Sequence, residues 1–135
     1  MDKIYTIGEI GEMFGLNSST LRYYEALGLL TDVMREENNR RVYTSKHIDR
    51  LNAIMCFKRT GLPVAGIADF FIYEKNLPEH IDDILQMLTE HEENITEQIH
   101  KLNEDLQHIK RKVRYYSAVK ESLSTGAEVP DFNSV

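Results

Sequence analysis

The chain has one cysteine, Cys56, and it is the side chain best suited to covalent chemistry. A thiolate is a nucleophile toward aldehydes, quinones and oxidants, and nearby cations favour the thiolate form. Lys58 and Arg59 lie close by in sequence, and on a helical wheel Cys56 falls off the apolar stripe of its predicted helix. A lone cysteine in a helix also commonly packs as an inert small hydrophobe. The sequence leaves a sensor role and an inert role open for Cys56.

Catalysis and metal binding are disfavoured by spacing. His47 and Cys56 are nine residues apart on one predicted helix, which separates them by about 13 Å along its axis, too far for a nucleophile and its base. A single cysteine forms no intrachain disulfide or thiolate cluster, and the five histidines show no i, i+4 pair on one helical face. We therefore expect no enzyme activity, no metal and no cofactor.

Residues 17–28 carry side chains suited to nucleic acid. Ser18, Ser19 and Arg22 can hydrogen-bond to bases or phosphates, and Tyr23 joins a flat apolar body to a hydroxyl. Tyr24 has the same chemistry, but its place beside the inner apolar face favours the core. Two adjacent arginines, at positions 40 and 41, add cations a short distance along the chain.

Short helices and a hairpin are expected to position these side chains. One helix ends at Gly15, and a second begins after the N-cap Asn17 and ends at Gly28. The polar stretch 31–41, with Asn38-Asn39 at its tip, favours a β-hairpin. A third helix spans about 46–59, and a fourth begins at Pro63. Two short helices followed by a hairpin with paired arginines are the parts of a winged helix-turn-helix DNA reader.

A long helix follows from about residue 79 to 123. Its apolar residues recur with a period of seven in two interleaved series, which predicts a coiled coil that packs on another chain. The polar residues Glu92 and Lys120 interrupt the series, and folding back on the same domain is the alternative. The members of this apolar seam are Leu88, Ile95, Ile99, Leu102, Leu106, Ile109, Val113 and Tyr116.

Composition and charge set the wider limits. The 135 residues are 41% hydrophobic, enough for one packed domain with an appended element. Taken alone, the net charge of −6 argues against a nucleic-acid-binding protein. Residues 1–62, however, hold 9 Lys and Arg and 8 Asp and Glu. The acidic excess therefore belongs to the second half. Without an export signal or an apolar run long enough to span a membrane, we expect a cytoplasmic protein with no membrane partner.

Three stretches in the first half of the chain carry a specific sequence pattern. The stretches YTIGEIGEMFGLNSSTLRYYEALGLL, NNRRVYTSKHIDRLNAI and FKRTGLPVAGI resemble, in order and spacing, the N-terminal domain of the MerR family of bacterial transcription regulators. The resemblance covers residues 3–73. It implies a mainly α fold with a winged helix-turn-helix domain over 3–73, an antiparallel-pairing coiled-coil helix over 79–123 and a short flexible tail over 124–135.

The resemblance also implies roles for particular residues. It places Ser18, Ser19, Arg22 and Tyr23 of the second helix on DNA, together with Arg41 and Tyr43 of the hairpin. Arg40 stands where the family commonly has an aromatic residue, which adds attraction to phosphate, and Lys58 is a further phosphate candidate. The single cysteine in IMCFKRTG resembles the aldehyde and electrophile sensors of the family.

We therefore predict a homodimeric regulator that binds double-stranded promoter DNA, distorts it and acts on RNA polymerase indirectly. The alternative is an architectural DNA binder of the excisionase type, which would bend DNA without an effector. The chain leaves about 12 residues after the long helix, too few for a ligand-binding domain. The inducer, the operator and the sign of regulation do not follow from the sequence.

Overall fold

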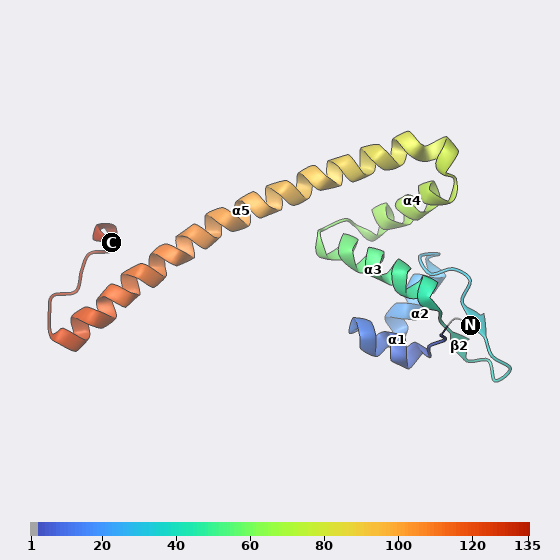
Figure 1. Ribbon diagram of the computed structural model, residues 1–135, viewed down its shortest axis with the longest axis horizontal. Helices are drawn as coiled ribbons and strands as arrows, with labels where there is room; N and C mark the ends of the chain where they lie inside the picture. The colour runs from blue at the N-terminus through green and yellow to red at the C-terminus, as the bar shows by residue number, and fades with distance from the viewer. Residues whose placement is uncertain (1–2) are drawn as a thin grey trace. The chain divides into compact units, whose positions relative to one another are not determined.

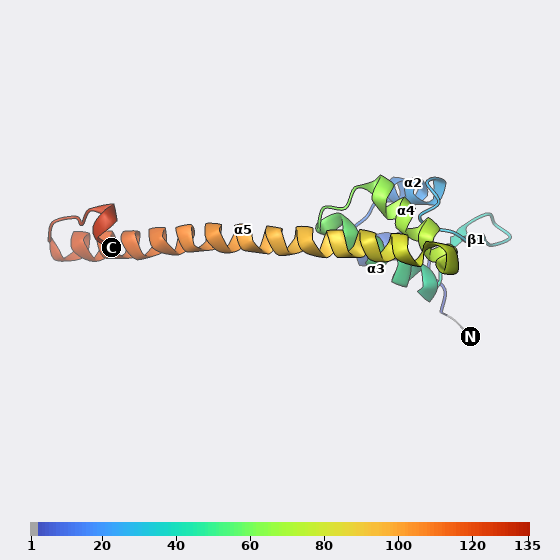
Figure 2. The same ribbon diagram turned by 90° about the horizontal axis from the view of Figure 1, so that it is seen from above.

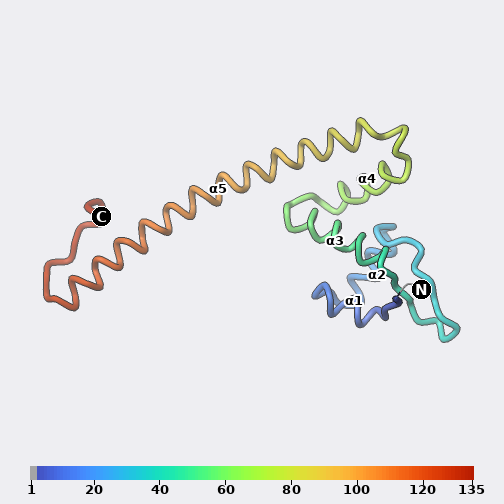
Figure 3. Tube along the Cα trace, in the orientation of Figure 1, coloured from blue at the N-terminus to red at the C-terminus, as the bar shows by residue number. Residues whose placement is uncertain are grey.

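The computed structural model describes residues 3–135, which form two units, one ending at Thr89 and the other spanning Glu90–Val135. The first unit is called the head here and contains four helices and a hairpin (Figure 1). The trace in Figure 3 follows them in chain order: α1 Ile7–Phe14, α2 Ser18–Ala26, β1 Met34–Arg35, β2 Arg41–Val42, α3 Ser45–Arg59 and α4 Val64–Lys75. Helix α5, Leu77–Thr125, begins in the head and continues into the second unit.

The helix ends follow local chemistry. Asn17 caps α2 as expected, because its side-chain oxygen accepts from the Thr20 amide at 2.8 Å. Gly15 takes the left-handed conformation that ends α1, with φ of 66°. Thr6 and Glu9 form a reciprocal capping box at the start of α1 that the sequence analysis did not identify.

The hairpin is a small antiparallel wing of two strands. Met34 pairs with Val42 and Arg35 with Arg41, and Asn39 at the tip adopts a left-handed φ of 68°. The Tyr5 and Tyr43 backbones exchange two hydrogen bonds of 2.8 and 2.9 Å, which add the N-terminal segment to the base of the wing. The wing is therefore anchored to the start of the chain as well as to its own turn.

One core holds the head together. Its central side chains come from every helix of the head and from both ends of the wing. They are almost completely buried: Ile10, Leu21, Tyr24, Leu29, Leu30, Tyr43, Leu51, Ile54, Ile67 and Phe71. Burying such side chains is the main term that stabilises a small domain.

Helix α5 differs in one respect from the expected single regular helix, since His80 has non-helical angles and marks a kink near its start. In the second unit the apolar seam is left open along one side of the helix. Leu102 is 67% exposed, Ile99, Leu106, Ile109, Val113 and Tyr116 are exposed as well, and Ile95 is half-buried. No helix within residues 3–135 has the length and apolar character needed to cross a membrane.

The end of the chain, for which a frayed or loosely docked tail is expected, turns back onto α5 (Figure 2). A short 3-10 helix, Phe132–Ser134, places the Phe132 ring 5.1 Å from Tyr115 and under the guanidinium of Arg111 at 4.4 Å. Arg111 also donates to the Asn133 side chain at 3.1 Å. An aromatic ring between a tyrosine and a cation explains why this segment docks despite its lack of periodicity.

Candidate nucleic-acid interface

Helix α2 presents most of its predicted contact residues to solvent. Arg22, Tyr23 and Ser19 are exposed, with 54% of Tyr23 accessible, and Ser18 is half-buried at the first turn. The Ser19 hydroxyl donates to the Asn17 cap at 2.7 Å, so it is held at the start of the helix. The structure therefore brings these four residues together on the first two turns of α2.

The wing adds a second cationic element beside α2. A cleft of about 390 Å³ lies between them, here called the arginine cleft, lined by Thr6, Ile7, Arg22, Asn39, Arg40 and Arg41. Within residues 3–135, Arg22 and Arg40 have no carboxylate partner. Guanidinium groups are suited to phosphate because their planar donors match its oxygens. The cleft thus concentrates uncompensated positive charge at one face of the head.

Arg41 is held differently from its neighbour Arg40. Its Nε donates to a carboxylate oxygen of Glu25 on α2 at 2.8 Å, and both side chains are about one-quarter exposed. Sequence reasoning assigned Arg41 to DNA and did not identify Glu25. The only sequence signal for Glu25 is its place in the motif LRYYE, residues 21–25, within the first of the three stretches that resemble the MerR family.

The structure corrects the expectation for Tyr43. Its side chain is completely buried and packs edge-on against the His47 ring at 5.5 Å, so it belongs to the core and not to a DNA-facing surface. The Tyr43 hydroxyl has no hydrogen-bond partner among the described residues. Burial raises the pKa of this hydroxyl, the charge of Glu25 raises it further, and the arginines of the wing and α2 oppose the shift.

Lys58 lies at the end of α3 and reaches back to α2. Its ammonium donates to the Tyr24 hydroxyl at 2.8 Å and lies 5.4 Å from the centre of that ring. Tyr24 is 1% exposed, in agreement with its predicted core position. The remaining Lys58 donors are exposed, so the residue joins two helices and still presents charge to solvent.

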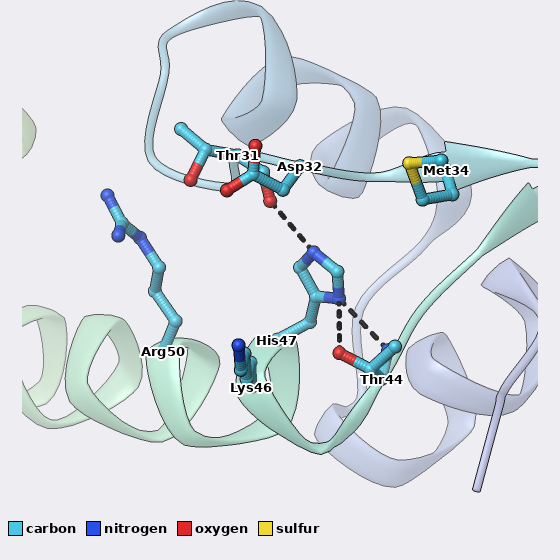
Figure 4. A pocket seen from close by; sticks show the side chains of 7 residues that line it. All are labelled: Thr31, Asp32, Met34, Thr44, Lys46, His47 and Arg50. Carbon is cyan, nitrogen blue, oxygen red and sulfur yellow. Dashed lines mark hydrogen bonds between the residues drawn. The ribbon is translucent and has the colours of Figure 1, made fainter. Parts of the chain in front are cut away.

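His47 is a structural residue that the sequence analysis did not single out for the fold. Its Nδ1 accepts from the Thr44 amide at 2.9 Å, which requires the proton on Nε2, and Nε2 then donates to the Thr31 carbonyl at 2.8 Å (Figure 4). The ring is 5% exposed. His47 therefore ties the chain before the wing to the chain after it.

Cys56 is exposed on α3. We expect N-ethylmaleimide to label one thiol per native chain without denaturant, because the Cys56 side chain is exposed. Mass spectrometry of the intact protein measures the label, and Cys56→Ser is the blank. Labelling that needs denaturant would contradict the exposed position.

Across residues 3–135 no three His, Cys, Asp or Glu side chains gather into a group that could hold a metal ion.

Helices α1 and α2 are joined by a glycine turn, α2 is polar and exposed, and a cationic wing follows them in the chain. These parts define a winged helix-turn-helix DNA-binding protein. Comparison with known proteins identifies the family. The family described as "MerR HTH family regulatory protein" matches residues 5–72 of this chain. The chain belongs to the MerR family of transcriptional regulators.

Whole-length relatives agree with this assignment. The chain is 32% identical over 133 residues to YyaN of Bacillus subtilis (strain 168), described as an uncharacterized HTH-type transcriptional regulator, and the match covers 89% of this chain and 96% of that protein. An uncharacterized HTH-type transcriptional regulator of Haemophilus influenzae is 29% identical over 116 residues, covering 86% of each chain. These relatives are transcriptional regulators and not enzymes.

A solved structure matches the fold over nearly the whole chain. It is HiNmlR, described as a MerR family regulator lacking the sensor domain, bound to promoter DNA. The TM-score is 0.80 with 27% identity, and the match covers 93% of this chain and 92% of that one. A MerR family regulator from Bacillus thuringiensis gives a TM-score of 0.70 with 28% identity, over 83% of this chain and 98% of that one.

Proposed function

We propose that the protein works as a homodimer that binds a pseudo-palindromic promoter site through α2 and the wing of each head. The observation that carries this proposal is the apolar seam, most of which is exposed in the single chain. A sustained apolar stripe with a period of 3.5 residues gains its stability by pairing with a like helix. A two-fold dimer then requires a two-fold site, with one half-site for each head.

Charge along α5 supports an antiparallel pair. Residues 76–100 contain seven Asp and Glu and no Lys or Arg, whereas residues 101–125 contain six Lys and Arg and three Asp and Glu. A parallel pair would set the two acidic halves side by side. An antiparallel pair sets each acidic half beside the basic half of the partner, and flanking charges of this kind fix helix orientation.

The DNA-facing elements extend the proposal to mechanism. Arg22 and the arginine cleft supply phosphate contacts, and Ser18 and Ser19 at the start of α2 reach base edges in the major groove. With two heads joined through one coiled coil, the bound dimer distorts the promoter, and RNA polymerase responds to the altered DNA shape. HiNmlR, the similar protein described as bound to promoter DNA, supports the promoter-binding part of this proposal.

Two measurements on the full chain test the proposal. Sedimentation equilibrium at micromolar concentration is expected to give twice the chain mass of 15.7 kDa. Selection of duplexes from a random pool, followed by footprinting, is expected to show two inverted half-sites. A monomer, or protection of a single half-site, would refute the proposed assembly.

Binding should also weaken steeply with salt despite the acidic sequence pI of about 5.3. Each neutralised phosphate contributes a slope of about −0.9 to log K against log salt. Arg40→Gln should therefore reduce the slope by about 2 per dimer, with a similar loss of affinity for every sequence. Lys101→Gln, which removes an exposed cation from α5, serves as the control. Equal slopes for the two variants would contradict a phosphate contact by Arg40.

A further inference from the structure

Glu25 and Arg41 form the one side-chain ion pair that joins α2 to the wing among residues 3–135. The two residues are 16 positions apart in sequence, and the Arg41 Nε to Glu25 Oε2 distance is 2.8 Å. At 23% and 24% exposure, both side chains are partly shielded from water. This pair therefore competes less with solvent than a surface ion pair does.

The ion pair leaves the outer part of the Arg41 guanidinium free. Only its Nε is engaged by Glu25, and its Nη1 and Nη2 groups have no partner among the described residues. Arg41 lines the arginine cleft together with Arg22 and Arg40. Since a guanidinium offers five donors in one plane, Arg41 can remain bound to Glu25 while it binds a phosphate.

Tyr43 is the neighbouring side chain that the sequence also assigned to DNA. Tyr43 follows β2, is completely buried, and is fixed by backbone hydrogen bonds to Tyr5. Its hydroxyl has no hydrogen-bond partner among the described residues, so it does not hold the Arg41 guanidinium. Hence Glu25, and not Tyr43, sets the direction of the Arg41 side chain.

We propose that Glu25 is a positioning residue for DNA binding. It orients the Arg41 side chain on the wing, so that the three arginines of the arginine cleft meet consecutive backbone phosphates together. The proposal rests on the proposed function, because it concerns how the same DNA-binding face is held in a binding-competent arrangement.

The proposal predicts an effect opposite in sign to that of charge alone. Removing a carboxylate from a DNA-facing surface reduces repulsion of phosphate, which by itself tightens binding. If Glu25 instead holds Arg41, its loss lets the arginine side chain sample other orientations. The affinity then falls by the fraction of molecules that stay competent.

The test uses the full-length protein and a labelled duplex selected by the wild-type protein from a random pool. Glu25→Gln is expected to bind about fivefold more weakly, which corresponds to about one dimer in five with both heads competent, or about 45% competence in each of two independent heads. Glu37→Gln removes the same charge from the exposed turn of the wing, where no contact is lost, and is expected to bind as tightly as wild type or more tightly. Fluorescence anisotropy gives both dissociation constants.

A double-mutant cycle separates positioning from a general structural role. If Glu25 acts through Arg41, the variant carrying both Glu25→Gln and Arg41→Gln should bind as Arg41→Gln does alone. Wild-type affinity or better for Glu25→Gln would overturn the proposal. An equal fold-loss from Glu25→Gln in the presence and absence of Arg41 would overturn it too.

A second readout needs no DNA. The Arg41 Nε–H resonance should be resolved and protected from exchange in the wild-type protein and should lose that protection in Glu25→Gln. If Glu25→Gln melts below the assay temperature, Glu25→Asp keeps the charge, withdraws the carboxylate by one methylene, and should weaken binding in the same way. Failure of the wild-type protein to select any duplex would refute the proposed function itself, whereas tight wild-type binding with unchanged Glu25→Gln refutes only this inference.

Discussion

Replacing Leu102 with Glu is expected to convert the dimer to monomers at micromolar concentration and to weaken binding to a two-half-site duplex by about 100-fold or more. Leu102 lies at the middle of the apolar seam and is 67% exposed in the single chain. In the proposed antiparallel pair the same region of both helices meets near the two-fold axis, so two carboxylates would be buried close together without a partner. Once the heads separate, the second half-site no longer binds as an intramolecular event.

Sedimentation velocity and anisotropy measure the two effects of Leu102→Glu. The matched control is Gln107→Glu, which adds the same charge at an exposed position on the outer side of the predicted heptad. It should remain dimeric and bind with wild-type affinity. A dimeric Leu102→Glu protein would show that the apolar seam is not the pairing surface.

The second large effect is expected at Tyr43, where two substitutions should differ sharply. Tyr43→Ala removes a completely buried ring and should lower the free energy of unfolding by about 3–5 kcal/mol. Tyr43→Phe keeps the ring and removes a buried hydroxyl that has no hydrogen-bond partner, so it should raise that free energy by up to about 1 kcal/mol. Urea unfolding at one fixed protein concentration, followed by circular dichroism, compares the variants.

The same Tyr43 variants decide between a core role and a DNA-binding role. If the side chain belongs to the core, Tyr43→Phe should bind the selected duplex as tightly as wild type. A loss of affinity without a loss of stability would restore the role in DNA binding that the sequence suggested for this tyrosine.

Local features of the fold could be predicted because their causes are local. The Asn17 cap, the end of α1 at Gly15 and the place of Asn39 at the tip of the wing each depend on one side chain and the backbone within a few residues of it. The apolar seam could be predicted for the same reason, since its period is a property of one helix. Resemblance to the MerR family then predicted that these local elements form one domain.

The parts of the site that were not predicted from the sequence depend on contacts between residues far apart in the chain. The Glu25 to Arg41 and His47 to Thr31 contacts each span 16 positions, and no spacing rule links such residues before the fold is known. Tyr43 shows the same limit, because strand alternation does not decide which face of a two-residue strand is covered. The backbone bridge to Tyr5 turns this tyrosine inward.

The unequal charge of the two halves of α5 also bears on which chains can pair. An apolar seam accepts many similar helices, because leucine and isoleucine pack against one another with little discrimination. A partner for this helix must in addition carry acid where this chain carries base, in reverse order. A related regulator with a uniformly acidic helix would meet repulsion along half of its length. In the proposed antiparallel pair, the charge pattern therefore favours a second copy of this chain over a helix of uniform charge.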